Sequence, residues 1–206
     1  VHVSEILLLS LTPEQMINLA QDVYVKPNQK IVSLVHGVSI SELSTLFKTP
    51  HCFRASSSYS AEINHSTIAL FPYSSCIHEL LHPLGRLITL ESENSFDIAT
   101  IGHCLNGWFY FLLHDLHHWL HEKGLSKGQA KELVLSHLED CIAYSRHYEA
   151  QPLLQLGQSI ASNGSFTAQG LEMLQLHQAN AAWSAACEVV FDAISTPSLT
   201  SQPLHN

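Results

Sequence analysis

Residues 30–43 read KIVSLVHGVSISEL, and this stretch decides the fold. Residues 30–35 form a short apolar run of the kind found in parallel strands that are covered on both faces. The run ends at His36-Gly37, and a helix is expected to start at Ser39. A strand that leads through a short turn into a helix is half of a βαβ unit, so these residues predict an α/β layer.

The same alternation extends to both sides of this stretch. Upstream, residues 5–11 read as a buried strand, and Thr12 suits the N-cap of a helix that has Pro13 at its first position. Downstream, residues 56–58 read as a loop and residues 74–84 as a helix. Further strands are expected at 52–54, 67–71 and 86–90. Residues 1–91 therefore predict βαβ units on a mostly parallel sheet.

After Glu91 the apolar residues recur at helical spacing instead. A further long helix is expected from about Thr167 to Ile194. The pattern predicts an all-helical domain of about four helices over residues 92–194, so the fold class is α/β plus all-α. The polar segment 195–206 contains two prolines and is predicted to be a disordered tail. The spaced apolar positions include Phe96, Ala99, Trp108, Leu112, Leu113, Leu116, Leu133, Val134, Leu138 and Ile142.

Composition excludes several classes of protein. A formal net charge of −9 with 9 Lys and Arg residues lacks the basic surface of a nucleic-acid binder. No apolar run is long enough to cross a bilayer. The five cysteines are widely spaced and form no CxxC pair, which argues against a disulfide framework and favours reduced thiols in a cytoplasmic protein. Neither a nucleic-acid nor a membrane partner is expected.

Several stretches, in order and with matching gaps, resemble the pyrroline-5-carboxylate reductase family. Residues 6–16 (ILLLSLTPEQM) look like the family's strand and AVKPQ turn, and residues 31–40 are similar to its VSIAAGIS segment. Residues 162–167 (SNGSFT) fall where the family has SPGGTT. The other matches are residues 68–72 to the strand after the MPNTP loop, 85–87 to VGK, 96–100 to the start of the helical domain, and 124–126 with Ala130 to GLPREEA.

This resemblance implies a partial Rossmann-type NAD(P)-binding domain followed by a helical dimerisation domain. In the family two chains interleave their long helices, and the substrate site lies at the dimer interface. The implied activity is reduction of a cyclic imine or related small substrate with NADPH or NADH, as in proline biosynthesis. The implied partners are a small-molecule substrate and a second copy of the chain.

The sequence departs from the family at its binding motifs. The GxGxxG turn that holds the dinucleotide pyrophosphate is absent and would precede residue 1. With no initiator Met and a core strand at its start, the chain reads as a fragment or as one whose numbering begins late. The MPNTP loop reads ASSSYS (55–60), and Ser58 takes the place of its Asn. The SGSGPAY turn, which presents backbone N–H groups to the substrate carboxylate, reads GHCLNGW (102–108), with its glycines displaced.

Candidate site residues follow from these positions. Thr167 matches the family's substrate-contacting Thr and is a candidate catalytic hydrogen-bond donor, although it also suits the N-cap of the last helix. His103 replaces a family residue at the substrate site and is a candidate proton donor. Substrate-binding candidates are Ser162, Gly164, Asn106 and Tyr59. Cofactor-binding candidates are Leu11, Thr12, Pro13, His36, Ser57 and Ser58, with an ordinary capping turn and polar loop as the alternative for Thr12-Pro13 and the serines.

The fifteen histidines raise the question of a metal site. Residues 78–82 (HELLH) fit HExxH, which on a helix places two imidazoles on one face for zinc, although Pro83 ends the helix there. His114, His117, His118 and His121 would share one helical stripe that can bind a metal ion or simply border an interface.

Three hypotheses therefore stand. The chain is a reductase of the pyrroline-5-carboxylate reductase type, an inactive or diverged homologue that serves as a dimeric binding or scaffold module, or a metal-binding protein or hydrolase that uses His78 and His82.

Overall fold

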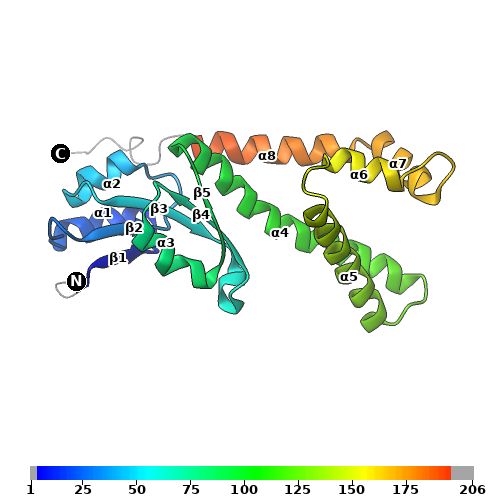
Figure 1. The fold of residues 1–206 in the computed structure, drawn as a ribbon, viewed down its shortest axis with the longest axis horizontal. Helices are drawn as coiled ribbons and strands as arrows, with labels where there is room; N and C mark the ends of the chain where they lie inside the picture. Colours follow the sequence, from blue (N-terminus) through cyan, green and yellow to red (C-terminus); the bar gives the residue numbers. More distant parts are fainter. Residues whose placement is uncertain (1–3, 196–206) are drawn as a thin grey trace. The chain divides into compact units, whose positions relative to one another are not determined.

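The computed structural model describes residues 4–195 (Figure 1). The chain divides into two compact units. Unit 1 comprises Val1–Asn106 and Glu188–Asn206, and unit 2 comprises Gly107–Cys187. The elements are β1 (Ile6–Leu9), α1 (Pro13–Asp22), β2 (Lys30–Ser33), α2 (Ile40–Phe47), β3 (Cys52–Ser57), the 3-10 helix η1 (Tyr59–Ile63), β4 (Ser66–Phe71), α3 (Ser75–Leu81), the 3-10 helix η2 (His82–Leu84), β5 (Gly85–Thr89), α4 (Glu93–Glu122), α5 (Lys127–His147), α6 (Leu153–Ile160), α7 (Phe166–Leu176) and α8 (Ala179–Ser195).

The five strands of unit 1 form one sheet in the order β1-β2-β3-β4-β5. β1, β2 and β3 are parallel, β4 runs antiparallel to β3, and β5 is parallel to β4. The mostly parallel sheet that the sequence predicts is confirmed. β4 is reversed because a parallel connection needs a crossover of a dozen or more residues, whereas β3 and β4 are joined by only residues 58–65.

Each face of the sheet carries its own hydrophobic core. On one face, Met16 of α1 and Leu43 and Phe47 of α2 pack with Ile31 and Cys52 of the strands. On the other, Ile77 and Leu81 of α3 pack with Val32, Phe53 and Leu70. Because successive strand residues point to opposite faces, Ile31 and Val32 enter different cores, and β2 has to be apolar on both sides.

Local capping sets where the first two helices begin. The Thr12 hydroxyl accepts a hydrogen bond from the Gln15 backbone N–H, and the Gln15 side-chain oxygen in turn accepts one from the Thr12 backbone N–H. Ser39 and Glu42 form the same reciprocal pair at the start of α2. Each pair satisfies two donors that a helix start leaves open. The predicted N-cap at Thr12 is therefore confirmed.

Three local expectations are wrong. Ser56 and Ser57 belong to β3 rather than to a loop, because the strand continues its pairing with β4 as far as Ser57 and Ile68. The helix expected from Thr167 to Ile194 is two helices, since Gln178 adopts a left-handed conformation (φ 53°) between α7 and α8. Ser195 is the last residue of α8, and the rest of the predicted tail lies outside the described residues.

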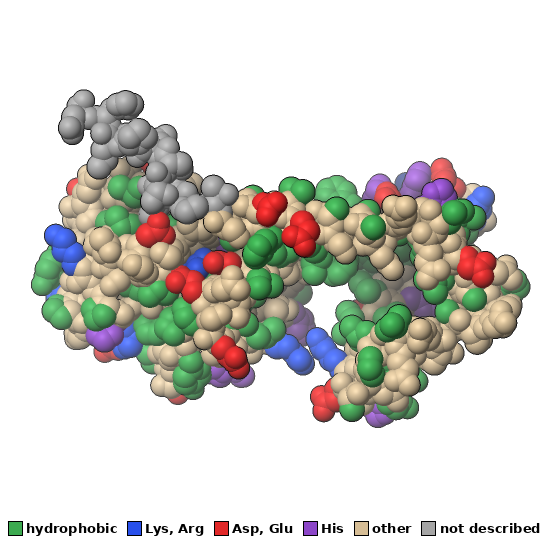
Figure 2. Space-filling view, turned by 90° about the horizontal axis from the view of Figure 1, so that it is seen from above, with side chains coloured by type: hydrophobic (Ala, Val, Ile, Leu, Met, Phe, Trp, Pro, Cys, Tyr) green, Lys and Arg blue, Asp and Glu red, His purple; other side chains and the backbone are tan. Residues whose placement is uncertain are grey.

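Unit 2 consists of helices with little interior. Of residues 107–187, only Ala130 and Leu156 are buried. Figure 2 shows hydrophobic side chains at the surface along these helices. None of the described helices is apolar over a stretch long enough to span a membrane. The large exposed apolar residues of the unit include Phe111, Leu116, Trp119, Leu138, Ile142, Leu154, Phe166 and Leu174.

Gly85 provides a test of the sheet. Its φ is +147°, and a Cβ atom there would lie 2.1 Å from the Ser66 carbonyl oxygen. We expect Gly85→Ala to lower the free energy of unfolding by about 2 kcal/mol or more, because both the backbone strain and the clash with β4 must be relieved. Urea unfolding measures the change. Gly102→Ala in α4 is the control: nothing lies within 4 Å of the new Cβ, and stability should hold or rise. Equal stability of both variants would contradict the close β4–β5 approach.

Candidate functional site

The carboxyl ends of β1, β2 and β3 meet at one edge of the sheet. Leu9 is in register with Ser33, and Ser33 with Arg54, so the segments that follow these strands emerge side by side. Ligands of open α/β sheets bind at such an edge. The structure thus brings all six candidate cofactor-binding residues to this edge: Leu11, Thr12 and Pro13 after β1, His36 after β2, and Ser57 and Ser58 at the end of β3.

A buried cation lies behind this edge. The Arg54 side chain in β3 is only 2% exposed, and its two terminal nitrogens reach Glu93 Oε1 at 2.9 Å and Asp97 Oδ1 at 2.8 Å. The guanidinium also lies over the Phe96 ring, 4.4 Å from its centroid. A buried charge is tolerated only when it is paired and hydrogen-bonded, so these contacts hold the first turns of α4 against the sheet.

Glu93 extends this link to a third element. Its Oε1 atom also accepts a hydrogen bond of 2.7 Å from the backbone N–H of Ile40, at the start of α2. One carboxylate therefore joins α4, β3 and the first turn of the helix that follows His36-Gly37. Two buried polar atoms on β3, Arg54 Nε and Ser56 Oγ, have no hydrogen-bond partner among residues 4–195.

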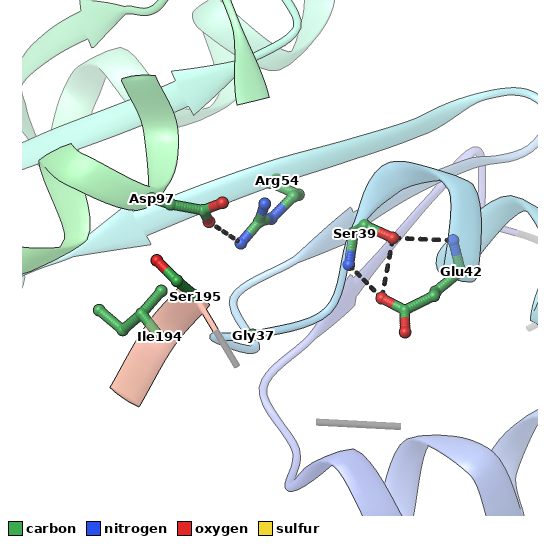
Figure 3. Close-up of a pocket in the computed structure, with 7 residues that line it drawn as sticks. All are labelled: Gly37, Ser39, Glu42, Arg54, Asp97, Ile194 and Ser195. Carbon is green, nitrogen blue, oxygen red and sulfur yellow. Dashed lines mark hydrogen bonds and ion pairs between the residues drawn. The ribbon is translucent and has the colours of Figure 1, made fainter. Parts of the chain in front are cut away.

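A cavity of about 320 Å³ adjoins this ion-pair cluster. Figure 3 shows Asp97 and Arg54 pointing toward each other and Ser39 paired with Glu42. The volume is at the small end of the range for ligand pockets. Two of its lining carboxylates, Asp97 and Glu42, already hold protein donors. The complete lining is Gly37, Ser39, Glu42, Arg54, Asp97, Ile194 and Ser195.

His103 and His36 are the two titratable imidazoles near the edge. His103 lies on α4, with Nδ1 3.3 Å from the Ala99 carbonyl oxygen and Nε2 3.1 Å from the Thr67 carbonyl oxygen. A neutral imidazole has one N–H, so only the imidazolium form donates to both carbonyls. The pKa of His36 is lowered from its ordinary value by burial, then by the positive charge of His103, then by that of Arg54.

The remaining candidates are distributed more widely. Tyr59 is the first residue of η1 and is 92% exposed. Asn106 lies on α4, which runs without a break through residues 102–108. The backbone N–H groups of this segment, which the family motif is implied to present to the substrate, lie within a continuous helix here. Asn106 can offer a ligand only its side chain.

Thr167, Ser162 and Gly164 belong to unit 2, around the start of α7. Ser165, not Thr167, is the N-cap: its hydroxyl accepts a hydrogen bond of 3.1 Å from the Ala168 backbone N–H. The alternative interpretation of Thr167 as a cap is thus wrong. Gly164 has a φ of +81°, a conformation that favours glycine. The candidate site residues therefore fall into two groups: Thr167, Ser162 and Gly164 in unit 2, and all the others in unit 1.

The histidines of the two candidate metal motifs contact each other or nearby carbonyl oxygens. His78 ends up in α3 and His82 in η2, with ring centroids 5.5 Å apart, because the helix stops before Pro83 as expected. In the second motif, His121 donates to the Leu125 carbonyl oxygen at 2.8 Å, and His117 lies 3.3 Å from that of Lys127. His114 and His118 stack at 6.3 Å. Residues 4–195 contain no group of three His, Cys, Asp or Glu side chains suited to a metal ion.

Sequence reasoning missed the ion-pair cluster of Arg54, Glu93 and Asp97. One signal was available: Arg54 lies in the middle of an otherwise apolar and small-residue strand, and a cation there has to find a carboxylate. Nothing local identifies its partners, because they lie 39 and 43 residues further along the chain.

The cluster makes a testable prediction about stability. Glu93→Gln with Asp97→Asn keeps two hydrogen-bond acceptors but leaves the buried Arg54 charge unbalanced, so we expect a loss of about 3–5 kcal/mol in the free energy of unfolding. Adding Arg54→Leu to this double variant should recover much of the loss, because no buried charge then remains. Urea unfolding of the three proteins measures both effects. The control removes two exposed carboxylates, Asp22→Asn with Glu91→Gln. A double variant as stable as this control would contradict the cluster's role.

Comparison with known proteins finds the same fold in solved structures. No family model and no curated protein matches the sequence. Solved structures do match. Pyrroline carboxylate reductase from Plasmodium falciparum with NADP bound aligns with a TM-score of 0.82 at 19% identity, over 92% of this chain and 75% of that one. The 1-pyrroline-5-carboxylate reductase from Streptococcus pyogenes gives 0.82 at 21% identity, over 93% and 76%.

A third structure agrees with these two. Pyrroline-5-carboxylate reductase from Coxiella burnetii gives a TM-score of 0.78 at 16% identity, over 96% of this chain and 77% of that one. The sheet with α1, α2 and α3 on its faces and the helices that follow are thus shared by three reductases from distant organisms. The chain has the fold of the pyrroline-5-carboxylate reductases, a Rossmann-type layer followed by a helical part, as its resemblance to that family predicts.

Proposed function

We propose that this protein is a nicotinamide-dependent reductase of the pyrroline-5-carboxylate reductase type, acting on a cyclic imine or a related small substrate. The observation that carries the proposal is the match in fold over more than nine-tenths of the chain, which includes a reductase solved with NADP. NADPH or NADH would supply the hydride. The five free cysteines suit a reducing cytoplasm, where we place the protein.

The carboxyl edge of β1–β3 is where we place the nicotinamide end of the cofactor. Leu11, Thr12 and Pro13 would line one side, His36 the middle, and Ser57 and Ser58 the other side. These residues fit only part of the cofactor. Ser57 is exposed and His36 has no side-chain hydrogen bond to residues 4–195, so both can contact a ligand. The sequence contains no glycine-rich turn for the pyrophosphate. The proposal therefore assigns the pyrophosphate to no residue of this sequence.

His103 is the proposed source of positive charge beside the substrate. Held by the Thr67 and Ala99 carbonyl oxygens, it would favour an anionic group and can release a proton toward an imine nitrogen when one of these contacts opens. Tyr59 and Asn106 would bind substrate from the same unit. Tyr59 in particular has nearly its whole side chain free for a ligand.

A second copy of the chain would complete the site. Unit 2 buries only Ala130 and Leu156 while exposing many large apolar side chains, which a small helical unit needs to cover. We infer a homodimer through the helical part, as the resemblance implies. Thr167, Ser162 and Gly164 would then bind substrate at the dimer interface, with the Thr167 hydroxyl donating to the substrate nitrogen.

One observation favours a second candidate, a diverged homologue without catalysis. Residues 102–108 are helical, so their backbone N–H groups do not form the substrate-facing turn that the family motif implies. Such a protein would dimerise and bind ligands without reducing them.

Cofactor binding tests the reductase proposal directly. Titration of the chain with NADPH and NADH, followed by energy transfer from its three tryptophans, should show saturable binding. Ser57→Asp should weaken that binding about tenfold, since a carboxylate at the edge repels the negatively charged dinucleotide. Ser136→Asp, on the exposed surface of α5, should leave the affinity unchanged. Absence of saturable binding would sink the reductase proposal, and equal affinities would move the cofactor away from β3.

The oligomeric state tests the second part. Sedimentation equilibrium should give about twice the chain mass of 22.9 kDa. Leu138→Glu, which puts a charge on an exposed apolar position of α5, should raise the dissociation constant about tenfold or more. Glu139→Lys changes the charge of the neighbouring exposed residue and is the control. A monomer at all concentrations would refute the dimer.

A further inference from the structure

His36 occupies a distinctive position among the cationic side chains of the edge. It lies three residues beyond the end of β2, its side chain is only partly buried, and the imidazole makes no hydrogen bond to residues 4–195. The other two basic side chains near it already have partners: both ring nitrogens of His103 face carbonyl oxygens, and both terminal nitrogens of Arg54 bind carboxylates. Of the three, only His36 has both a donor and an acceptor atom available to a ligand.

The charges around His36 come from three elements. Arg54 of β3 and His103 of α4 both repel its protonated form. The nearby carboxylates are already engaged: Glu93 and Asp97 of α4 pair with Arg54, and Glu42 of α2 holds the Ser39 hydroxyl and backbone N–H. None of these carboxylates is among the groups that shift the His36 pKa. Among residues 4–195, the two charged groups that act on this ring are both positive, and no carboxylate is one of them.

We propose that His36 binds an anionic oxygen of the ligand, a carboxylate or a phosphate, and takes up a proton as it does so. The inference deepens the proposed function and rests on it in one respect, that ligands bind at the carboxyl edge of the sheet. An anion placed against His36 offsets the repulsion from His103 and Arg54 and turns a neutral hydrogen bond into a charge-assisted one. The next residue, Gly37, lines the 320 Å³ cavity.

The sign of the pH dependence follows from this coupling. Burial and the two neighbouring charges lower the pKa of free His36 from its ordinary 6.5, and a bound anion raises it again. Between the free and the bound pKa, binding carries one proton into the protein. The affinity for the anion should therefore be highest below the free pKa and weaken as the pH rises through this window, whereas a ligand without a negative charge should show no such slope.

Proton NMR of the imidazole resonances tests the proposal. The His36 signal is identified by its loss in His36→Gln and followed over pH in the free protein, then with NADP⁺, with L-proline, with inorganic phosphate and with L-prolinamide, which lacks the carboxylate. We expect the His36 midpoint to move up in pH with at least one of the three anions and to stay in place with L-prolinamide. A shift with NADP⁺ alone identifies a cofactor phosphate as the partner, and a shift with L-proline alone identifies the substrate carboxylate.

Affinity measurements separate this inference from the proposed function. His36→Gln should weaken binding of the effective anion about tenfold below the free pKa and abolish the pH slope. His51→Gln, at an exposed position before β3, should change neither. If NADP⁺ or L-proline binds but leaves the His36 midpoint in place, the inference is overturned while the reductase function stands. If nicotinamide cofactors do not bind but phosphate or L-proline moves His36, the function fails and the inference stands. If none of the anions moves it, the inference is wrong.

Discussion

The buried charge of Arg54 is the constraint on which the arrangement of unit 1 depends. A guanidinium that is 2% exposed has to be matched by anions, and Glu93 and Asp97, one turn apart on α4, supply them. Glu93 simultaneously holds the first turn of α2 through the Ile40 backbone N–H. Sheet, α2 and α4 are therefore joined at one point, directly behind the edge where the three parallel strands end.

The basic side chains at the edge differ in the contacts that they make. Arg54 fixes the start of α4, and His103, six residues beyond Asp97 on the same helix, reaches the Thr67 carbonyl oxygen in β4. His103 thus adds a second link between α4 and the sheet. His36 does not link α4 to the sheet. It lies in the turn after β2, and its side chain makes no hydrogen bond to residues 4–195. Structural cations thereby set the electrostatic environment of a side chain that is free for a ligand.

Unit 2 depends on a different constraint, the need to cover apolar surface. Two of its helices, α5 and α7, are capped through the Ser126–Gln129 and Ser165–Ala168 hydrogen bonds, so the starts of these two helices are set locally. Their apolar side chains nonetheless have almost no interior to enter, with only Ala130 and Leu156 buried. The helices of unit 2 therefore form without an apolar core of their own. The proposed second copy of the chain would cover their exposed apolar side chains.

The sequence by itself determined the features that depend on neighbouring residues. The apolar runs around Ile31 and Ile68, the caps at Thr12 and Ser39 and the helix end before Pro83 are all local, and they predict the alternation of strands and helices that the structure contains. The tertiary structure alone decided the rest. Arg54 meets partners 39 and 43 residues away, and His103 meets a carbonyl 36 residues away. Pattern and propensity describe what a segment can form, whereas pairing across the sheet depends on where the whole chain places each segment.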